Sequence, residues 1–187
     1  RAGASSPTAT MRSPTMRTAP ERAGLPVPSM IRTCVIVVLG RTPAQADSLA
    51  AELRCTPAAS PADLAAQCSV VVLCVSADAD VLQVVDALLP ALRPGAIVID
   101  CSTVSADTAR NAAQRLAAQH VYFLAAPVSG GVEGARDGTL AIMVGGDATA
   151  FERARPVLAA MGRTITHFGP SGAGQAAKAT NQIMCAS

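Results

Sequence analysis

From residue 34 onward, uniformly apolar segments alternate with segments that carry helix-start signals. Most of the apolar segments have no polar face, which is typical of strands buried on both sides of a sheet. Because helical segments separate them, we expect an α/β fold: a doubly wound, mostly parallel sheet with helices on both faces. The predicted strands span residues 34–39, 70–75, 96–100, 121–124, 139–144 and 164–168.

The helices are predicted from their first residues. Thr42-Pro43 and Ser60-Pro61 each combine a favourable N-cap with a proline at the first helical position. Ser105, followed by an acidic residue in the first turn, is a third N-cap. The predicted helices span residues 42–54, 60–67, 80–89, 105–119 and 147–161 (despite Pro156), and a last one begins near Gly174. Residues 129–138 contain four glycines and are predicted as a loop.

Composition excludes several classes of function. The net charge is +2 and aromatic residues make up 2% of the chain, so nucleic-acid binding is disfavoured. No apolar run is long enough to span a bilayer, and we expect no membrane association. The six cysteines form no C-x-x-C pair, so we expect reduced thiols in the core and no metal site: Cys34, Cys55, Cys68, Cys74, Cys101 and Cys185.

Residues 1–30 differ from the rest of the chain. They are rich in Arg, Ser, Thr and Pro, and Glu21 is their one acidic residue. This composition is typical of a disordered leader or of a transit peptide. A non-native leader, such as translation of a wrong reading frame, fits the same composition. We therefore expect a cytoplasmic protein, or an organellar one if these residues belong to a transit peptide.

Polar residues follow several predicted strands directly, at the sheet edge where doubly wound folds bind dinucleotides. Arg41 beside Thr42 suits the 2′-phosphate of NADP, although a solvated arginine at a helix start is equally consistent. Ser102 and Thr103 offer two hydroxyl groups that can bind a carboxylate or an amide. Small residues after the strand at 70–75, beginning with Ser76, let a cofactor approach the backbone.

A second set of candidates lies in the last third of the chain. Ser129-Gly130-Gly131 exposes consecutive backbone N–H groups, which suits a substrate carboxylate; an ordinary flexible loop is the alternative. Lys178 is the only lysine among the fifteen lysines and arginines. Lysine, unlike arginine, can release its proton when desolvated, as an acid/base catalyst must. Asn181, one turn later, can hold a substrate oxygen; the alternative is a solvated lysine beside a polar residue.

In these segments, at this order and spacing, the chain resembles the 3-hydroxyacid dehydrogenase family, which includes 3-hydroxyisobutyrate dehydrogenase and the glyoxylate/succinic semialdehyde reductases. The resemblance is most specific over residues 126–146 and 172–181. It implies a Rossmann-type cofactor domain and NAD(P)-dependent interconversion of a 3-hydroxy acid and its semialdehyde or keto form. It also implies NADP rather than NAD and a small carboxylate substrate.

The resemblance assigns roles residue by residue. It implies that Lys178 is the catalytic lysine, with Asn181 as a helper amide, and that Ser129, Gly130 and Gly131 hold the substrate carboxylate. By the same resemblance, the cofactor contacts are Arg41, Thr42, Val75, Ser76 and Thr103.

The chain departs from the family pattern in three places. Residues 21–30 stand about where a G-x-G-x-x-G loop is expected, and they contain two prolines and one glycine. No counterpart of the family's all-helical C-terminal domain is present, and Ala125 replaces a common Asp.

The expected organisation is a leader at 1–30, an NAD(P)-binding domain at 31–171 and the start of an interdomain helix at 172–187. A homo-oligomer is expected for the full-length enzyme. The alternative is a non-catalytic or truncated remnant that acts at most as a binding or assembly module.

Overall fold

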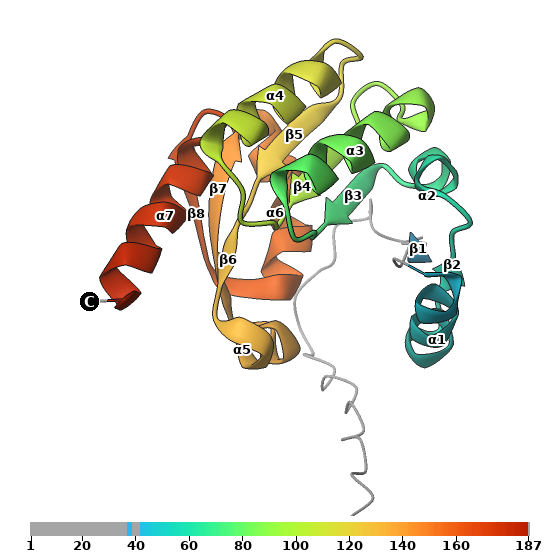
Figure 1. The fold of residues 1–187 in the computed structure, drawn as a ribbon, viewed down its shortest axis with the longest axis horizontal. Helices are drawn as coiled ribbons and strands as arrows, with labels where there is room; N and C mark the ends of the chain where they lie inside the picture. Colours follow the sequence, from blue (N-terminus) through green and yellow to red (C-terminus); the bar gives the residue numbers. More distant parts are fainter. Residues whose placement is uncertain (1–36, 39–41, 187) are drawn as a thin grey trace, which may run out of the picture. The chain divides into compact units, whose positions relative to one another are not determined.

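The computed structural model of the chain describes residues 37–38 and 42–186, which belong to one compact unit, Val35–Ser187 (Figure 1). The predicted leader at 1–30 and the candidate Arg41 lie outside the described residues. The elements are, in chain order, β1 (Val37–Val38), α1 (Pro43–Leu53), β2 (Thr56–Pro57), α2 (Pro61–Gln67), β3 (Val70–Leu73), α3 (Asp78–Leu88), the 3-10 turn η2 (Leu89–Ala91), β4 (Ile97–Asp100), α4 (Ala106–Ala117), β5 (Tyr122–Ala125), β6 (Val128–Ser129), α5 (Gly131–Asp137), β7 (Leu140–Gly146), α6 (Ala148–Met161), β8 (Gly162–Gly169) and α7 (Ala173–Ala186).

The strands form two sheets. β1 and β2 pair in parallel as a two-stranded sheet, and a six-stranded sheet has the order β3-β4-β5-β7-β6, with β8 also paired to β7. In the larger sheet, β3–β4, β4–β5 and β7–β8 are parallel, as the apolar strands predicted. The pairs β5–β7 and β6–β7 are antiparallel. The connection from β6 to β7 is one seven-residue helix, too short for a parallel crossover.

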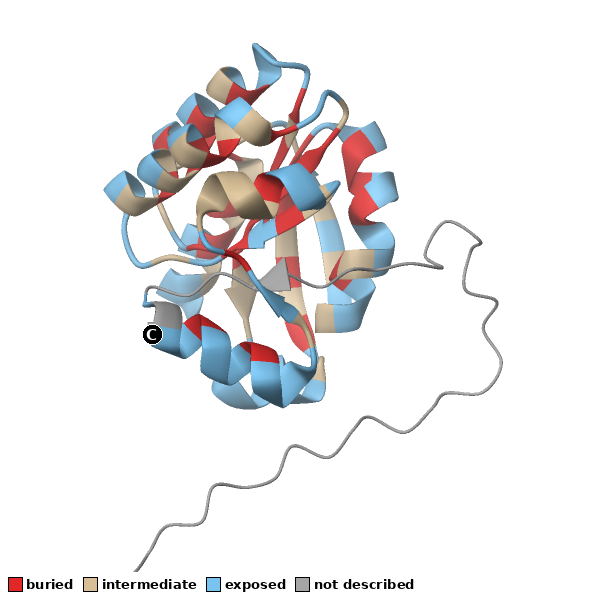
Figure 2. Cartoon of the chain, turned by 90° about the vertical axis from the view of Figure 1, so that its right-hand side faces the viewer, coloured by how far each residue is buried: buried red, intermediate tan, exposed pale blue. Residues whose placement is uncertain are grey.

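Each face of the sheet has its own hydrophobic core. On one face, Val98 of β4 and Phe123 of β5 pack with buried residues of α3 and α4. On the other face, Ile99 and Leu124, the next residues along the same strands, pack against α6. Figure 2 shows the buried residues on the strands and on the inward sides of the helices. This alternation confirms the doubly wound architecture that the apolar strands predicted.

The predicted helix starts are confirmed. The side chains of Thr42, Ser60, Ser105 and Asp147 each accept a hydrogen bond from a backbone N–H three residues later. Each of these bonds satisfies one of the N–H groups that a helix leaves without an internal partner at its start. Helix α6 also continues through Pro156, as expected.

Two boundaries differ from the sequence expectation. β3 ends at Leu73 rather than at residue 75, because the N–H of Val75 donates to the side-chain hydroxyl of Ser102 rather than to the strand ladder (2.9 Å). The loop predicted at 129–138 is wrong: the structure has strand β6 and helix α5 there. Gly134 faces Leu140, where a Cβ would lie 3.2 Å from the leucine side chain, so this glycine serves close packing.

Candidate functional site

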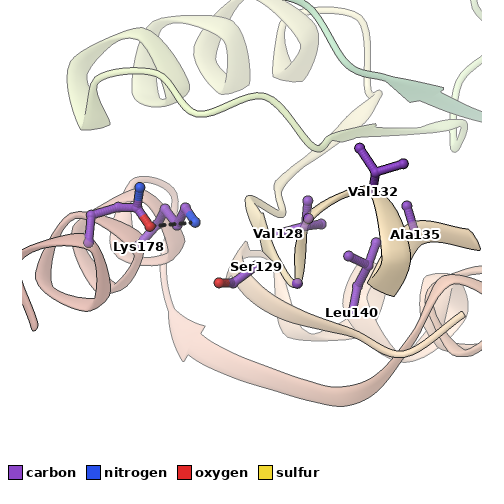
Figure 3. A pocket seen from close by; sticks show the side chains of 9 residues that line it. Val128, Ser129, Val132, Ala135, Leu140 and Lys178 are labelled. Carbon is purple, nitrogen blue, oxygen red and sulfur yellow. Dashed lines mark hydrogen bonds between the residues drawn. The ribbon is translucent and has the colours of Figure 1, made fainter. Parts of the chain in front are cut away.

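A pocket of 530 Å³ lies between α7 and the segment from β6 to β7. It brings together Lys178 and the predicted Ser129-Gly130-Gly131 segment, which are about fifty residues apart in the sequence. Figure 3 shows the Ser129 hydroxyl pointing toward the helix that carries Lys178. The complete lining is Val128, Ser129, Gly130, Gly131, Val132, Ala135, Leu140, Lys178 and Gln182.

Lys178 is the one charged side chain in this lining. It is 6% exposed, and its Nζ donates a hydrogen bond to Oε1 of Gln182, one turn further along α7 (3.0 Å). A buried ammonium group that reaches a pocket can donate a proton to a substrate oxygen. Gln182 was not singled out from the sequence, although its position one helical turn after the lysine was a usable signal.

Asn181 joins the two sides of the site. Its Nδ2 lies 3.5 Å from the Oγ of Ser129, at the outer limit of a hydrogen bond. The sequence placed both residues in one site, and the structure shows that they touch.

Gly130 and Gly131 shape the floor of the pocket. Gly130 has φ +134°, and a Cβ there would lie 3.2 Å from the Leu140 side chain. Gly131 has φ +63°, and no other atom lies within 4 Å of the place a Cβ would take. Because these glycines carry no side chain, their backbone is open to an anionic group in the pocket.

The position of Lys178 depends on two further glycines that sequence reasoning missed. A Cβ on Gly145 of β7 would lie 2.6 Å from the backbone N of Gly174 in α7. A Cβ on Gly174 would lie 2.7 Å from the carbonyl oxygen of Ala125 in β5. Helix α7 therefore packs backbone to backbone on the sheet, one turn before Lys178. The G-x-G spacing at residues 172–174 was the signal that could have indicated this contact.

Ser102 is not among the residues that line this pocket, and its predicted substrate contact stays a prediction. It is 1% exposed, and its hydroxyl accepts the N–H of Val75 (2.9 Å). Its own N–H donates to Oδ1 of Asp100 (2.9 Å), and its carbonyl accepts Nε2 of Gln175 in α7 (2.8 Å). Ser102 therefore connects the ends of β3 and β4 to the helix that carries Lys178.

Other cofactor candidates lie at the ends of β3 and β4. Ser76 and Thr103 are exposed, and Val75 is partly buried, with its N–H held by Ser102. None of the three belongs to the lining of the Lys178 pocket. Thr42 caps α1 through its hydroxyl, which accepts the N–H of Gln45 (3.4 Å).

Two carboxyl groups near these strand ends have shifted pKa values. Burial raises the pKa of Asp100 to about 6, although hydrogen bonds from Ser102 partly oppose the rise. Asp100 is fully buried, and its Oδ2 has no hydrogen-bond partner among the described residues. In contrast, hydrogen bonds from Thr108 and Ser105 lower the pKa of Asp78 to about 2. The first site favours a protonated acid and the second a carboxylate.

The arrangement of the strand ends is suited to binding one part of a dinucleotide cofactor. The carboxyl ends of β3, β4 and β5 meet at the same edge of the sheet, where exposed Ser76 and Thr103 leave room for a ligand. The segment expected to hold the pyrophosphate precedes the described residues.

Within residues 37–38 and 42–186, no group of three or more His, Cys, Asp or Glu side chains is arranged to hold a metal ion. No helix in those ranges has the length and apolarity to cross a bilayer.

Comparison with known proteins identifies dehydrogenases among the relatives of this chain. The chain is 52% identical to a 3-hydroxyisobutyrate dehydrogenase of Pseudomonas aeruginosa over 99 residues, which is 53% of this chain and 33% of that protein. It is 50% identical to an NAD-dependent L-serine dehydrogenase of the same organism over 101 residues, or 54% of this chain and 34% of that one. The chain thus spans about a third of the length of these relatives.

Solved structures agree with the sequence relatives. A Mycobacterium tuberculosis 3-hydroxyisobutyrate dehydrogenase with L-serine superimposes with a TM-score of 0.75 at 38% identity, covering 79% of this chain and 50% of that one. Psf3 in complex with NADP+ and 2-OPP gives a TM-score of 0.73 at 31% identity, covering 79% and 53%. Residues 30–169 match the family model described as the NAD binding domain of 6-phosphogluconate dehydrogenase. The chain belongs to this family of NAD-binding oxidoreductase domains.

Proposed function

We propose that the chain is the cofactor domain of an oxidoreductase that interconverts a small 3-hydroxy acid and its semialdehyde or keto acid. The observation that carries the proposal is the pocket in which Lys178 meets Ser129, Gly130 and Gly131, with Asn181 in contact with Ser129. It combines a buried cation with open backbone and hydroxyl groups. Such a site can hold a carboxylate at one end and exchange a proton at the other.

Each residue has a chemical task in this proposal. A nicotinamide cofactor supplies or accepts the hydride when it is bound. In the direction of reduction, the Nζ of Lys178 donates a proton to the carbonyl oxygen; in oxidation it accepts the hydroxyl proton. Ser129 and the backbone of Gly130 and Gly131 hold the carboxylate. Asn181 orients the reacting oxygen through its side-chain amide.

NADP is the proposed cofactor form. Arg41 beside Thr42 supports it, because a guanidinium group next to a hydroxyl suits a 2′-phosphate. Psf3, one of the similar structures, holds NADP+. A relative that is 50% identical over 101 residues is an NAD-dependent L-serine dehydrogenase, so the two forms must be compared directly.

The non-catalytic alternative is supported by one feature of the sequence. Residues 21–30 contain two prolines and one glycine about where a G-x-G-x-x-G loop is expected. Without such a loop, cofactor affinity should fall severely. Calorimetric titration of the purified chain with NADPH and then NADH separates the two functions. Tighter binding of NADPH supports the proposal, and a folded chain that binds neither cofactor supports the alternative.

The catalytic assignment is tested in the full-length protein with Lys178→Arg, which keeps the charge but cannot release a proton. We expect kcat for reduction of a small semialdehyde to fall by about 10²–10⁴-fold, with NADPH affinity unchanged. Thr180→Ala is the control, because Thr180 is exposed on the same helix and its hydroxyl donates to the carbonyl oxygen of Ala176. Near-normal turnover by the arginine variant would overturn the role of Lys178.

A further inference from the structure

The side chain of Gln175 is buried between α7 and the segment that follows β4. It is 4% exposed, and both ends of its amide are used. Its Nε2 donates to the carbonyl oxygen of Ser102 (2.8 Å), and its Oε1 accepts the N–H of Val104 (3.3 Å). One side chain therefore holds both backbone groups that flank Thr103. Among ionised and neutral side chains of this length at neutral pH, glutamine is the one that carries a neutral donor and a neutral acceptor side by side.

Gln175 connects two parts of the candidate site, the segment 102–104 that it bonds and the helix that carries it. Thr103 lies in the segment at the cofactor edge of the sheet. Lys178 is three residues after Gln175 on α7, so the two side chains leave neighbouring turns on the same side of the helix. A change at Gln175 therefore alters where Lys178 stands relative to the cofactor edge.

Ser102 extends this connection into the sheet. Its hydroxyl holds the N–H of Val75 after β3, and its N–H is held by Asp100 at the end of β4. The chain of contacts from Val75 through Ser102 to Gln175 consists of hydrogen bonds with donor–acceptor distances of 2.8 and 2.9 Å. Burial excludes water from competing at Ser102 and Gln175, so the contacts are long-lived.

We propose that Gln175 is a positioning residue: its amide fixes the helix that carries Lys178 to the segment 102–104, and so sets the distance between the proton donor and the cofactor edge. This inference rests on the proposed function. Gln175 touches neither substrate nor cofactor in the proposal. Its effect on catalysis is transmitted through the placement of α7 and of Thr103.

The first experiment removes the amide while keeping its length, with Gln175→Met in the full-length protein. We expect kcat for semialdehyde reduction to fall on the order of 10²-fold, because a misplacement near 1 Å costs about that much, with KM changed by less than about threefold. Gln114→Met is the matched control, since Gln114 is exposed on α4. A kcat equal to that of the wild type would overturn the inference.

Amide hydrogen exchange tests the contact without any activity. The N–H of Val104 loses its acceptor in Gln175→Met, so we expect its exchange to accelerate at least about tenfold, with the amides of β4 unchanged. If the wild type reduces no semialdehyde, the proposed function fails while this measurement still decides the contact. If Val104 exchanges at the wild-type rate in the variant, the positioning role is wrong even in an active enzyme.

Gln175→Glu distinguishes positioning from a loss of packing. A protonated glutamic acid can donate to Ser102 and accept from Val104, whereas a carboxylate cannot donate. We expect kcat of this variant to recover toward the wild-type value as the pH falls, while Gln175→Met shows no recovery. A Gln175→Glu profile parallel to that of Gln175→Met would contradict a hydrogen-bonded role.

The pH profile needs the wild type as its reference, because other ionisable groups surround this position. Asp100 lies next to Ser102, and Asp78 is bonded to Ser105. Arg110 of α4 lies beside Gly172 at the start of α7, and Lys178 lies one turn along the helix. The ratio of variant to wild-type kcat at each pH removes their common contribution.

Discussion

Two regions of the six-stranded sheet are joined to α7 by different kinds of contact. At the ends of β3 and β4, buried hydrogen bonds centred on Ser102 connect the strands to each other and to α7. At β7, the contact with α7 is made by Gly145 and Gly174, whose backbones approach too closely for any side chain. The same helix is therefore held by polar bonds on one side and by steric fit on the other.

Because the contacts differ, the two regions should be sensitive to different perturbations. The hydrogen bonds around Ser102 include Asp100, whose pKa is raised to about 6, so this region should respond to protonation. A backbone-to-backbone contact responds to volume and is insensitive to pH. The predictions below separate these responses, beginning with the largest expected effect.

The glycine contact should be the most sensitive to substitution. In Gly174→Ala, the new Cβ would meet the carbonyl oxygens of Met143 and Ala125, which belong to strands that cannot move freely. We expect a loss of about 3 kcal/mol, or roughly 10 °C in Tm by circular dichroism. Gly95→Ala is the control: no atom lies within 4 Å of its Cβ position, so only its φ of +83° is strained. Equal shifts in the two variants would show that the helix does not depend on this contact.

The hydrogen-bonded region at the ends of β3 and β4 should respond to pH through Asp100. Its folded pKa is about 6, above the ordinary value of 3.8, so its contribution to stability is complete below pH 3.8 and is lost as the pH rises through about 6. We expect the unfolding free energy to fall by up to about 3 kcal/mol over this window relative to Asp100→Asn. Urea titrations between about pH 3.5 and about pH 7.5, a range that brackets both pKa values, measure it. Parallel curves for the two proteins would refute a buried, protonatable Asp100.

Ser102→Ala should produce a smaller loss of unfolding free energy in the same hydrogen-bonded region. It removes the acceptor of the Val75 N–H and leaves that partly buried group without its partner. We expect a cost of about 1–2 kcal/mol, measured as a shift of the urea midpoint at constant slope. Ser76→Ala, at an exposed position, is the comparison variant and should change the midpoint little. An unchanged midpoint in Ser102→Ala would mean that Ser102 does not hold the strand ends together.

The smallest effect is expected at Asp78, and it should have the opposite dependence on pH. Thr108 and Ser105 lower its folded pKa to about 2, so its contribution is present above pH 3.8 and is lost as the pH falls toward 2. The carboxylate is exposed to solvent, so its contribution is smaller than that of Asp100. Tm measured down an acid series should fall less steeply in Asp78→Asn than in the wild type. A steeper fall in the variant would reverse the sign and exclude the assignment.

The sequence alone identified the α/β architecture, and four of its candidate site residues, Lys178, Ser129, Gly130 and Gly131, line one pocket. Apolar strands and helix-start signals are local features, so Thr42, Ser60 and Ser105 could be assigned as caps without a fold. The lone lysine and the Ser129-Gly130-Gly131 segment are also local, and their chemistry follows from residue type. Their meeting in one pocket was predicted only through the resemblance and required the fold to be seen.

Only the tertiary structure shows the contacts of Ser102, Gln175 and the paired glycines. Ser102 has the residue type of a ligand-binding hydroxyl, but its neighbours Val75 and Asp100 turn it into a buried connector. Gly145 and Gly174 look like ordinary glycines until β7 and α7 are placed against each other. Burial and distance between residues far apart in sequence determine these roles, and neither quantity is encoded in any local segment.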